Sequence, residues 1–470
     1  MKKVMIRLNL KNVAMNRLLK ALSQGTLLTL LIFLLLAQWT HADPLVIRNV
    51  NVLTMESDQI FENQSIVIEN GLIQWIGPDS ELRLPENVEV IEGDFYVMPG
   101  LAEMHAHIPS SRQGVEAMER VLKLNLAMGI TTVRGMLGDP VHLELREEAE
   151  SSGVHYPRII TSGPSFNGNT ATSPDVTRQM VRVQVQAGYD LLKLHPGITL
   201  ENFEALSDEA QKQQIEFSGH ISAGIGLERT LNSGQGTIEH IDRYMEFLAG
   251  EAADRPEPPV IFFGYDLTPH VNASKIDEAA EMTRDAGVWV VPTNTLLENV
   301  FNPDYSPEAM SGWPGMEFVS EGVLNSWVNT VRQIRASDAY DKEQASKFLE
   351  VRNDLTKALQ EHGDRLLLGA DSPQIFNPPG FATHRELGLL VEAGLTPYEA
   401  IKTGTVNVGR YLGETDQTGK IAPGYRADLI LLRSNPLEAI PFHDAISGVI
   451  YRGFYLSEEE LDDMLNSLLE

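Results

Sequence analysis

The sequence of 470 residues contains no cysteine, which excludes disulfide bonds and thiolate metal ligands. A metal site in this chain must therefore use histidine, carboxylate or a less usual ligand. Acidic residues are also absent from residues 1–42, although the whole chain has 65 of them. Hydrophobic residues make up 43% of the sequence, enough for a substantial core, and the length suits a large barrel plus a smaller domain.

Residues 1–42 have the pattern of a secretory signal peptide. Six basic residues precede an apolar run from Leu27 to Ala37, and small residues follow at Thr40 and Ala42. The apolar run is too short to span a bilayer comfortably. An uncleaved N-terminal anchor is the alternative interpretation. We expect an exported protein, periplasmic or secreted, with no stable membrane span after cleavage of the signal.

The chain that follows this segment is strongly acidic. Without the six basic residues of the segment, 31 of the 37 basic residues remain against 65 acidic ones, a net charge near −34. Such a surface repels nucleic acid and anionic membranes. We therefore expect no nucleic-acid partner, whereas a homo-oligomer stays open.

Both ends of the remaining chain contain short strand patterns. A hairpin is indicated over residues 65–77 because Asn70-Gly71 separates two apolar runs. Residues 44–96 are interpreted as a small antiparallel β unit, and further strands are expected over residues 419–432 and 446–455. The prediction is a composite β-sandwich domain of residues 43–96 and 416–456, followed by an acidic helix over residues 457–470.

Residues 97–415 alternate strand and helix patterns, which is typical of parallel βα units. Eight such units over about 300 residues predict a (β/α)₈ TIM barrel, so the fold class is α/β. A long helix is expected over residues 397–411. The candidate barrel strands are Val97–His105, Ile130–Gly135, Arg158–Gly163, Tyr189–Leu194, Ile215–His220, Thr237–His240, Val288–Pro292 and Leu366–Asp371.

Polar side chains gather at the carboxyl ends of these strands, and these ends meet at one mouth in a parallel barrel. His105 and His107 are two residues apart and therefore point to the same side of a strand, where they could hold one metal ion. The other candidate ligands are Lys193, His220, His240 and Asp371. Two unrelated histidines, and an aspartate that only caps a helix, are the structural alternatives.

Lys193 needs a special explanation in this set, because a cation among metal ligands must be neutralised. A lysine late in an apolar strand often extends to water or pairs with an acid. A desolvated lysine instead has a lowered pKa and a nucleophilic amine, and reaction with CO₂ would convert it to a carbamate able to bridge two metals. The sequence therefore suggests two divalent metal ions, zinc being the default for a histidine-rich hydrolytic site.

Other polar residues are candidates for substrate contacts. His195 follows Lys193 by two residues and could face the mouth. Arg134 ends the second strand and could bind a substrate carboxylate, with a structural salt bridge as the alternative. Tyr244 and Tyr265 are further candidates at the mouth.

The chain resembles the amidohydrolase superfamily of metal-dependent (β/α)₈ hydrolases over roughly residues 44–456. The resemblance rests on Pro99-Gly100-Leu101 before His105-x-His107, on Ile238-Glu239-His240, on Gly369-Ala370-Asp371-Ser372 and on the returning segment 419–431. It implies His105, His107 and Asp371 on the more buried metal, His220 and His240 on the other, and carboxylated Lys193 as the bridge.

Within the superfamily, the lysine-containing pattern is similar to the branch of prolidase-like, arginine-carboxypeptidase-like and ochratoxinase-like enzymes. Those peptidases often carry a Gly-Gly-His-Gly-like stretch after the third strand, whereas residues 162–170 contain no histidine. This departure leaves the exact substrate open.

The expected function is hydrolysis of a C–N bond in an amide or dipeptide, or another small molecule. Asp371 would act as the general base that takes a proton from the attacking water and passes it to the leaving amine. One alternative is a mononuclear enzyme similar to a deaminase or an imidazolonepropionase, with Lys193 only structural. An alternative of another class is a non-catalytic exported metal- or solute-binding protein.

Overall fold

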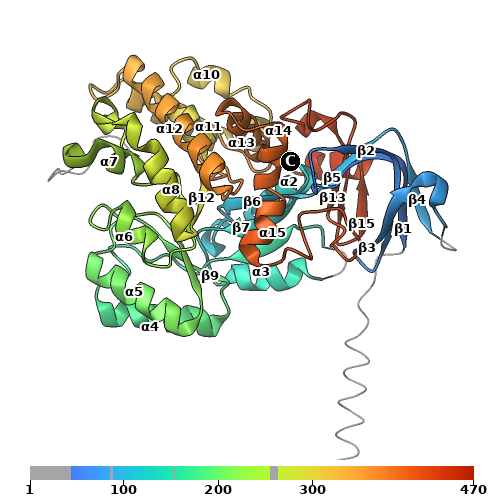
Figure 1. Cartoon of the computed structure of the whole chain (residues 1–470), viewed down its shortest axis with the longest axis horizontal. Coiled ribbons are helices and arrows are strands. Elements are labelled where there is room, and N and C mark those ends of the chain that lie inside the picture. Colours follow the sequence, from blue (N-terminus) through green and yellow to red (C-terminus); the bar gives the residue numbers. More distant parts are fainter. Residues whose placement is uncertain (1–43, 85–87, 152–153, 254–262, 470) are drawn as a thin grey trace, which may run out of the picture. The chain divides into compact units, whose positions relative to one another are not determined.

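The computed structural model describes residues 44–84, 88–151, 154–253 and 263–469 (Figure 1). The signal peptide predicted over residues 1–42 lies outside the described residues. Within the described ranges, no helix is both long and apolar enough to cross a bilayer.

Strands from both ends of the described chain form one eight-stranded sheet (Figure 1). Its order is β15-β14-β13-β5-β1-β2-β3, and β4 pairs with β1. Its first five strands are β1 (Leu45–Leu53), β2 (Ile60–Glu69), β3 (Leu72–Pro78), β4 (Glu89–Glu92) and β5 (Tyr96–Pro99). The returning strands are β13 (Leu429–Leu432), β14 (Ile446–Tyr451) and β15 (Phe454–Ser457).

The N-terminal part of this sheet is mixed, so the expected purely antiparallel unit is wrong. The hairpin of β2 and β3 forms as predicted, and its Asn70-Gly71 turn has φ values of 54° and 74°. Both β4 and β5, however, run parallel to β1. Buried aliphatic residues of β1, β2 and β13 form a separate apolar core for this β domain.

The barrel consists of seven strands and one further extended segment. The parallel strands are β6 (Leu101–Ala106), β7 (Ile130–Gly135), β8 (Arg158–Thr161), β9 (Leu191–Leu194), β10 (Glu216–Gly219), β11 (Thr237–Glu239) and β12 (Trp289–Val291). They form a β6-β7-β8 sheet and a β12-β11-β10-β9 sheet.

Isolated parallel bridges connect these two sheets into a ring. Ser162 pairs with Leu191, Val290 pairs with Leu366, and Ala106 pairs with Ser372. Residues 366–372 thus take the eighth place, between β12 and β6, although they form bridges and not a named strand. The structure agrees with the predicted α/β fold of a barrel with a β domain.

Helices follow the barrel strands, except the last helix, which follows β15 of the β domain. Those of the first five βα units are α2 (Val115–Ala127), α3 (Val141–Ala149), α4 (Pro174–Ala187), α5 (Leu200–Gln213) and α6 (Leu227–Leu231). The remaining ones are α7 (Tyr244–Ala249), α8 (Ile276–Ala286), α9 (Asn294–Phe301), α10 (Pro307–Met310), α11 (Glu321–Arg335), α12 (Lys342–Gly363), α13 (Phe381–Glu392), α14 (Pro397–Thr403), α15 (Val406–Leu412) and α16 (Glu458–Asn466).

Two predicted elements are divided in the structure. The expected strand Val97–His105 breaks at Gly100, where the chain leaves the β domain for the barrel. The Gly100 amide donates to the carbonyl of Asp428 at 2.7 Å, whereas the next amide, Leu101, donates to Gly129 at 3.0 Å. The helix expected over residues 397–411 is likewise two helices, α14 and α15.

Candidate metal centre

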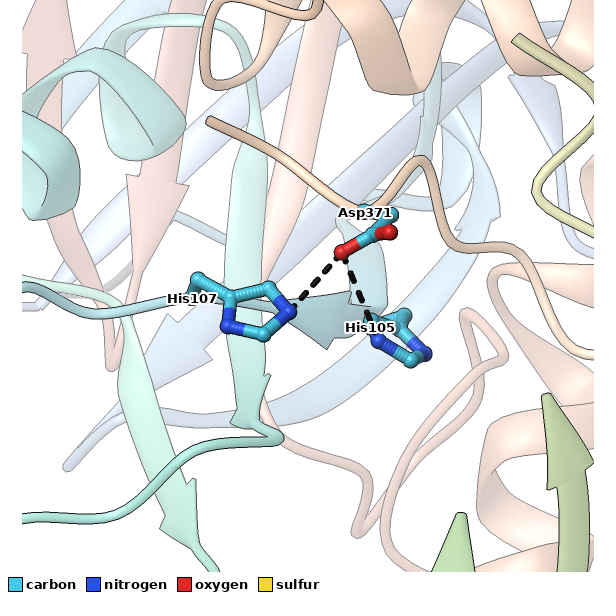
Figure 2. A group of neighbouring side chains, drawn as sticks. All are labelled: His105, His107 and Asp371. Atoms are coloured by element: carbon cyan, nitrogen blue, oxygen red, sulfur yellow. Dashed lines mark ion pairs between the residues drawn. The ribbon is translucent and has the colours of Figure 1, made fainter. Parts of the chain in front are cut away.

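His105, His107 and Asp371 converge at the mouth of the barrel (Figure 2). His105 lies on β6, and His107 follows its last residue, so the two imidazoles share one side of the strand. Oδ1 of Asp371 lies 2.8 Å from Nε2 of His107 and 3.5 Å from Nε2 of His105. The ligand atoms of the three residues all lie within 4.8 Å of one another, which is close enough to share one ion.

Close packing of the eighth segment on β6 brings Asp371 to this position. A Cβ on Gly369 would lie 2.9 Å from the amide nitrogen and 3.0 Å from Cβ of His105, so only glycine fits there. Asp371 itself has a φ of 58°, an uncommon conformation that recurs at functional sites. Gln374 donates to Oδ1 of Asp371 at 2.7 Å and helps to fix the carboxylate.

A chain of imidazole contacts extends from this group across the barrel. The centroid of the His105 ring lies 5.4 Å from that of His107 and 4.7 Å from that of His240. His240 is 4.6 Å from His220, which is 5.2 Å from His195. Five histidines from four parts of the barrel therefore lie side by side.

Three of these histidines are held at Nδ1, which leaves Nε2 for the site. Nδ1 of His105 lies 2.6 Å from Oε2 of Glu239, and Nδ1 of His220 lies 2.8 Å from Oδ2 of Asp242. Nδ1 of His240 lies 2.7 Å from the hydroxyl of Thr293. Metal-binding histidines typically bond the second ring nitrogen to such groups, since this bond fixes the tautomer and the ring orientation.

Lys193 lies on β9 within this polar group and is fully buried. Its Nζ has no hydrogen-bond partner among the described residues. Burial lowers the pKa of Lys193 to about 8, opposed by the negative charges of Glu239 and Asp371. A buried amine without a partner is costly, so this residue calls for a chemical explanation.

The donor set fits divalent transition metals. Burial, reinforced by nearby positive groups, lowers the pKa of His105 and of His240 well below the usual range. Both rings are therefore neutral near pH 7, the form that binds metals. Imidazole and carboxylate without thiolate suit zinc and other first-row divalent ions.

Comparison with known proteins places this arrangement in a family. A sequence model described as "Amidohydrolase family" matches residues 96–455. The chain belongs to the amidohydrolase family. It is therefore a member of a family of metal-dependent hydrolases, and its relatives support action on C–N bonds.

Individual relatives are distant. The chain is 23% identical over 321 residues to ochratoxinase of Aspergillus niger, a match that covers 64% of this chain and 53% of ochratoxinase. It is 23% identical to 5-methylthioadenosine/S-adenosylhomocysteine deaminase of Caldanaerobacter subterraneus, covering 87% of this chain and 88% of the deaminase. The match thus spans about half the length of ochratoxinase but most of the deaminase.

A solved structure shares the fold. A Xaa-Pro dipeptidase with bound methionine in its active site superposes with a TM-score of 0.62 at 20% identity. The match covers 88% of this chain and all of the dipeptidase chain. Together with the bridged ring of strands, this likeness confirms the predicted barrel architecture.

Arg134 of this amidohydrolase faces the barrel interior, which corrects its placement as a substrate-binding group. The side chain is 0% exposed, and its Nη2 lies 3.0 Å from Oε1 of Glu239. Nε donates to the carbonyl of Met104 at 2.7 Å, and Nη1 donates to the hydroxyl of Tyr411 at 2.7 Å. The structure therefore favours the structural salt bridge, the alternative interpretation.

The two tyrosines considered for the mouth are buried in the helical layer. Tyr244 bonds the hydroxyl of Thr283 at 2.7 Å, and the hydroxyl of Tyr265 donates to the carbonyl of Asp341 at 2.9 Å. These partners direct both hydroxyls into the helical layer and not to the mouth, which corrects the placement of Tyr244 and Tyr265. His195 remains in the group, and its Nδ1 is buried without a hydrogen-bond partner within the described part of the chain.

Four supporting residues were not among the predicted site residues: Glu103, Glu239, Asp242 and Thr293. Glu103 is fully buried and accepts from the amides of His105 at 2.8 Å and Ala370 at 3.0 Å, which ties the two ligand-bearing segments together. Burial raises the pKa of Glu103 to about 7. Its place two residues before His105, as a carboxylate within an apolar strand, was the available sequence signal.

Proposed function

We propose that this chain is an exported, binuclear metal-dependent amidohydrolase that cleaves the C–N bond of an amide or dipeptide. The observation that carries the proposal is Lys193, whose buried amine lies within a group of four candidate histidine ligands and Asp371. A carbamate formed from Lys193 and CO₂ would exchange this unpartnered amine for an anion with two oxygen ligands. Export rests only on the charge and hydrophobicity pattern of residues 1–42.

The proposed ligands divide into two sets joined by Lys193. His105, His107 and Asp371 would hold one ion, and His220 and His240 would hold the other. Carboxylated Lys193 would contribute one oxygen to each set. Two bound divalent ions, with zinc expected, would supply Lewis acidity for the scissile carbonyl and acidify the attacking water.

Asp371 is the proposed general base. Its Oδ1 lies 2.8 Å from His107 and its Oδ2 lies 4.0 Å from Nε2 of His240, so the carboxylate borders both ligand sets. It would accept a proton from the attacking water and return it to the departing amine. His195, next to His220, is the proposed contact for a polar group of the substrate.

Screening of the metal-loaded full chain against dipeptides and N-acyl amino acids tests this function. We expect hydrolysis of at least one class, with two metals per chain by elemental analysis. A chain that binds no metal after reconstitution, or a two-metal chain inactive on all amides but active as a deaminase, would contradict the proposal.

The second candidate is a mononuclear enzyme of the deaminase or imidazolonepropionase type. It is favoured by one observation, since His105, His107 and Asp371 already form a compact group without Lys193. The deaminase relative also matches most of the chain. Full metal content and activity in a Lys193→Ala variant would decide for this candidate.

A further inference from the structure

A polar layer lies inside the barrel beneath the histidines, where barrels of this kind usually contain layers of branched apolar side chains. Glu239 and Arg134 are both 0% exposed and form an ion pair of 3.0 Å. The hydroxyl of Thr237 also donates to Oε1 of Glu239. Replacing a buried ion pair by apolar residues often costs nothing, so packing alone does not explain this pair.

The two oxygens of Glu239 have different partners. Oε1 accepts from Arg134 and Thr237, while Oε2 lies 2.6 Å from Nδ1 of His105. An ionised carboxylate only accepts hydrogen bonds, so Nδ1 of His105 must carry the proton. The lone pair of Nε2 is then directed to the side on which Asp371 lies, 3.5 Å away.

Arg134 contacts both Glu239, which supports the His105 ring, and the backbone immediately before His105. Its Nε donates to the carbonyl of Met104, the residue before His105, at 2.7 Å. Its Nη1 donates to Tyr411, which in turn donates to Glu216 of β10. This side chain therefore supplies the charge that buried Glu239 requires and connects β6 with β10, β11 and α15.

We infer that Glu239 is a positioning residue of the metal centre, and that Arg134 fixes Glu239 in place. Glu239 sets the tautomer and the orientation of His105 through one hydrogen bond. The inference rests on the proposed function, because it takes His105 as a metal ligand. Glu239 of the Ile238-Glu239-His240 segment thus has a role separate from that of the neighbouring ligand His240.

Two double variants isolate this hydrogen bond. Arg134→Met/Glu239→Gln removes both charges but keeps an oxygen acceptor for His105, whereas Arg134→Met/Glu239→Ala removes the acceptor as well. Both variants lack the same two charges, so the electrostatic cost of removing the pair cancels in the comparison. We expect the alanine form to bind metal about 10- to 100-fold more weakly than the glutamine form.

Competition with a chelator measures this affinity for zinc, and circular dichroism of the metal-free proteins reports folding. The control is Glu216→Gln, which alters the same polar layer at a residue that accepts from Ser218 and Tyr411, and its zinc affinity should equal that of the wild type. Equal affinities in the two folded double variants would overturn the inference. Failure of the wild type to bind zinc would instead contradict the proposed function itself.

If one double variant does not fold, Glu239→Gln and Glu239→Asp in the wild-type background provide the second test. Aspartate keeps the charge but its shorter side chain draws the acceptor back from Nδ1 of His105. We expect weaker zinc binding in Glu239→Asp than in Glu239→Gln. The opposite order would show that charge, and not the hydrogen bond to His105, is what matters.

Discussion

The two halves of the candidate metal centre differ in whether their side chains have partners within the protein. The first half consists of His105, His107 and Asp371, and the second of His220, His240 and Lys193. On one side, Asp371 lies 2.8 Å from Nε2 of His107, within hydrogen-bond distance, and 3.5 Å from Nε2 of His105. On the other side, Lys193 is buried near enough to His240 to add to the effect of burial in lowering the pKa of that histidine, and the Lys193 amine has no hydrogen-bond partner in the described residues.

This difference indicates which half depends on a further component. A carboxylate within hydrogen-bond distance of an imidazole has a partner even without an ion, whereas a buried, unpartnered amine destabilises the fold. The first half is therefore preorganised by the protein, whereas in the proposed centre carboxylation of Lys193 completes the second half.

The largest effect is expected at Asp371, which borders both halves. Asp371→Asn keeps the shape of the side chain but removes the proposed proton acceptor, so kcat should fall by about 10³-fold. Metal content, measured on the same sample, should stay close to that of the wild type. Asp285→Asn, at an exposed carboxylate, is the control, and unchanged turnover in Asp371→Asn would refute the role.

Lys193→Met should have opposite effects on activity and on stability. Loss of the proposed bridging ligand should lower activity by about 10²-fold, while removal of a buried amine should raise the unfolding midpoint of the metal-free protein. Urea unfolding of the metal-free forms measures the second effect. Lys123→Met, at a partly exposed i,i+4 pair with Glu119, provides the comparison.

A lower midpoint for metal-free Lys193→Met than for the wild type would mean that the amine has a stabilising partner. Lys193 would then be a structural residue, and the contrast between the two halves would disappear.

Gly369→Ala tests the close packing that preorganises the first half. The added Cβ would lie 2.6 Å from Val291 and 2.9 Å from the amide of His105, so the eighth segment must shift from β6. We expect a loss of about 1–3 kcal/mol in the free energy of unfolding. Metal should also bind more weakly, because Asp371 moves with the segment.

Gly322→Ala is the matched control for this substitution. Gly322 lies in α11, and a Cβ there would meet nothing within 4 Å, so the variant should be neutral or slightly stabilising. Equal stabilities of the two variants would show that residues 366–372 tolerate displacement from β6.

The last predicted effect is on the pH dependence of stability and concerns Glu386, which supports the start of α9 beside the second half. Glu386 is buried and accepts from the amides of Asn294 and Thr295, next to Thr293, which holds His240. Burial raises the pKa of Glu386 to about 7 from an ordinary value of 4.5. The folded protein thus retains this proton above pH 4.5, where the unfolded chain has lost it.

Stability contributed by this proton is fully present below pH 4.5 and is lost as the pH rises through about 7. Relative to Glu386→Gln, the wild type should therefore lose at most about 3 kcal/mol between pH 4.5 and pH 8. Urea unfolding at several pH values gives this difference. A constant difference would mean that Glu386 is ionised throughout.

Much of the candidate site follows from strand ends in the sequence. His105, His107, Lys193, His220, His240 and Asp371 were selected because they end parallel strands, and the structure brings them to one mouth. Arg134 was selected by the same rule but faces inward. Its partner Glu239 lies 105 residues away, and local pattern does not reveal such a pairing.

Pairing between distant residues also limited the prediction of the fold. The alternation of strands and helices predicted the barrel, and Asn70-Gly71 predicted the hairpin. The break at Gly100 was missed because residues 97–105 are continuous in character. β5 separates from β6 because it pairs with the parallel β1 and with β13, which lies more than 300 residues later in the chain.

The dependence of zinc stoichiometry on CO₂ distinguishes a centre bridged by carboxylated Lys193 from one that is not. The full chain and Lys193→Met are purified without chelator and reconstituted with zinc, either in bicarbonate or in CO₂-depleted buffer, and zinc per chain is measured. We expect two zinc ions for the wild type in bicarbonate, fewer without CO₂, and one for Lys193→Met in both buffers. Equal stoichiometry in all four samples would contradict a centre bridged by Lys193.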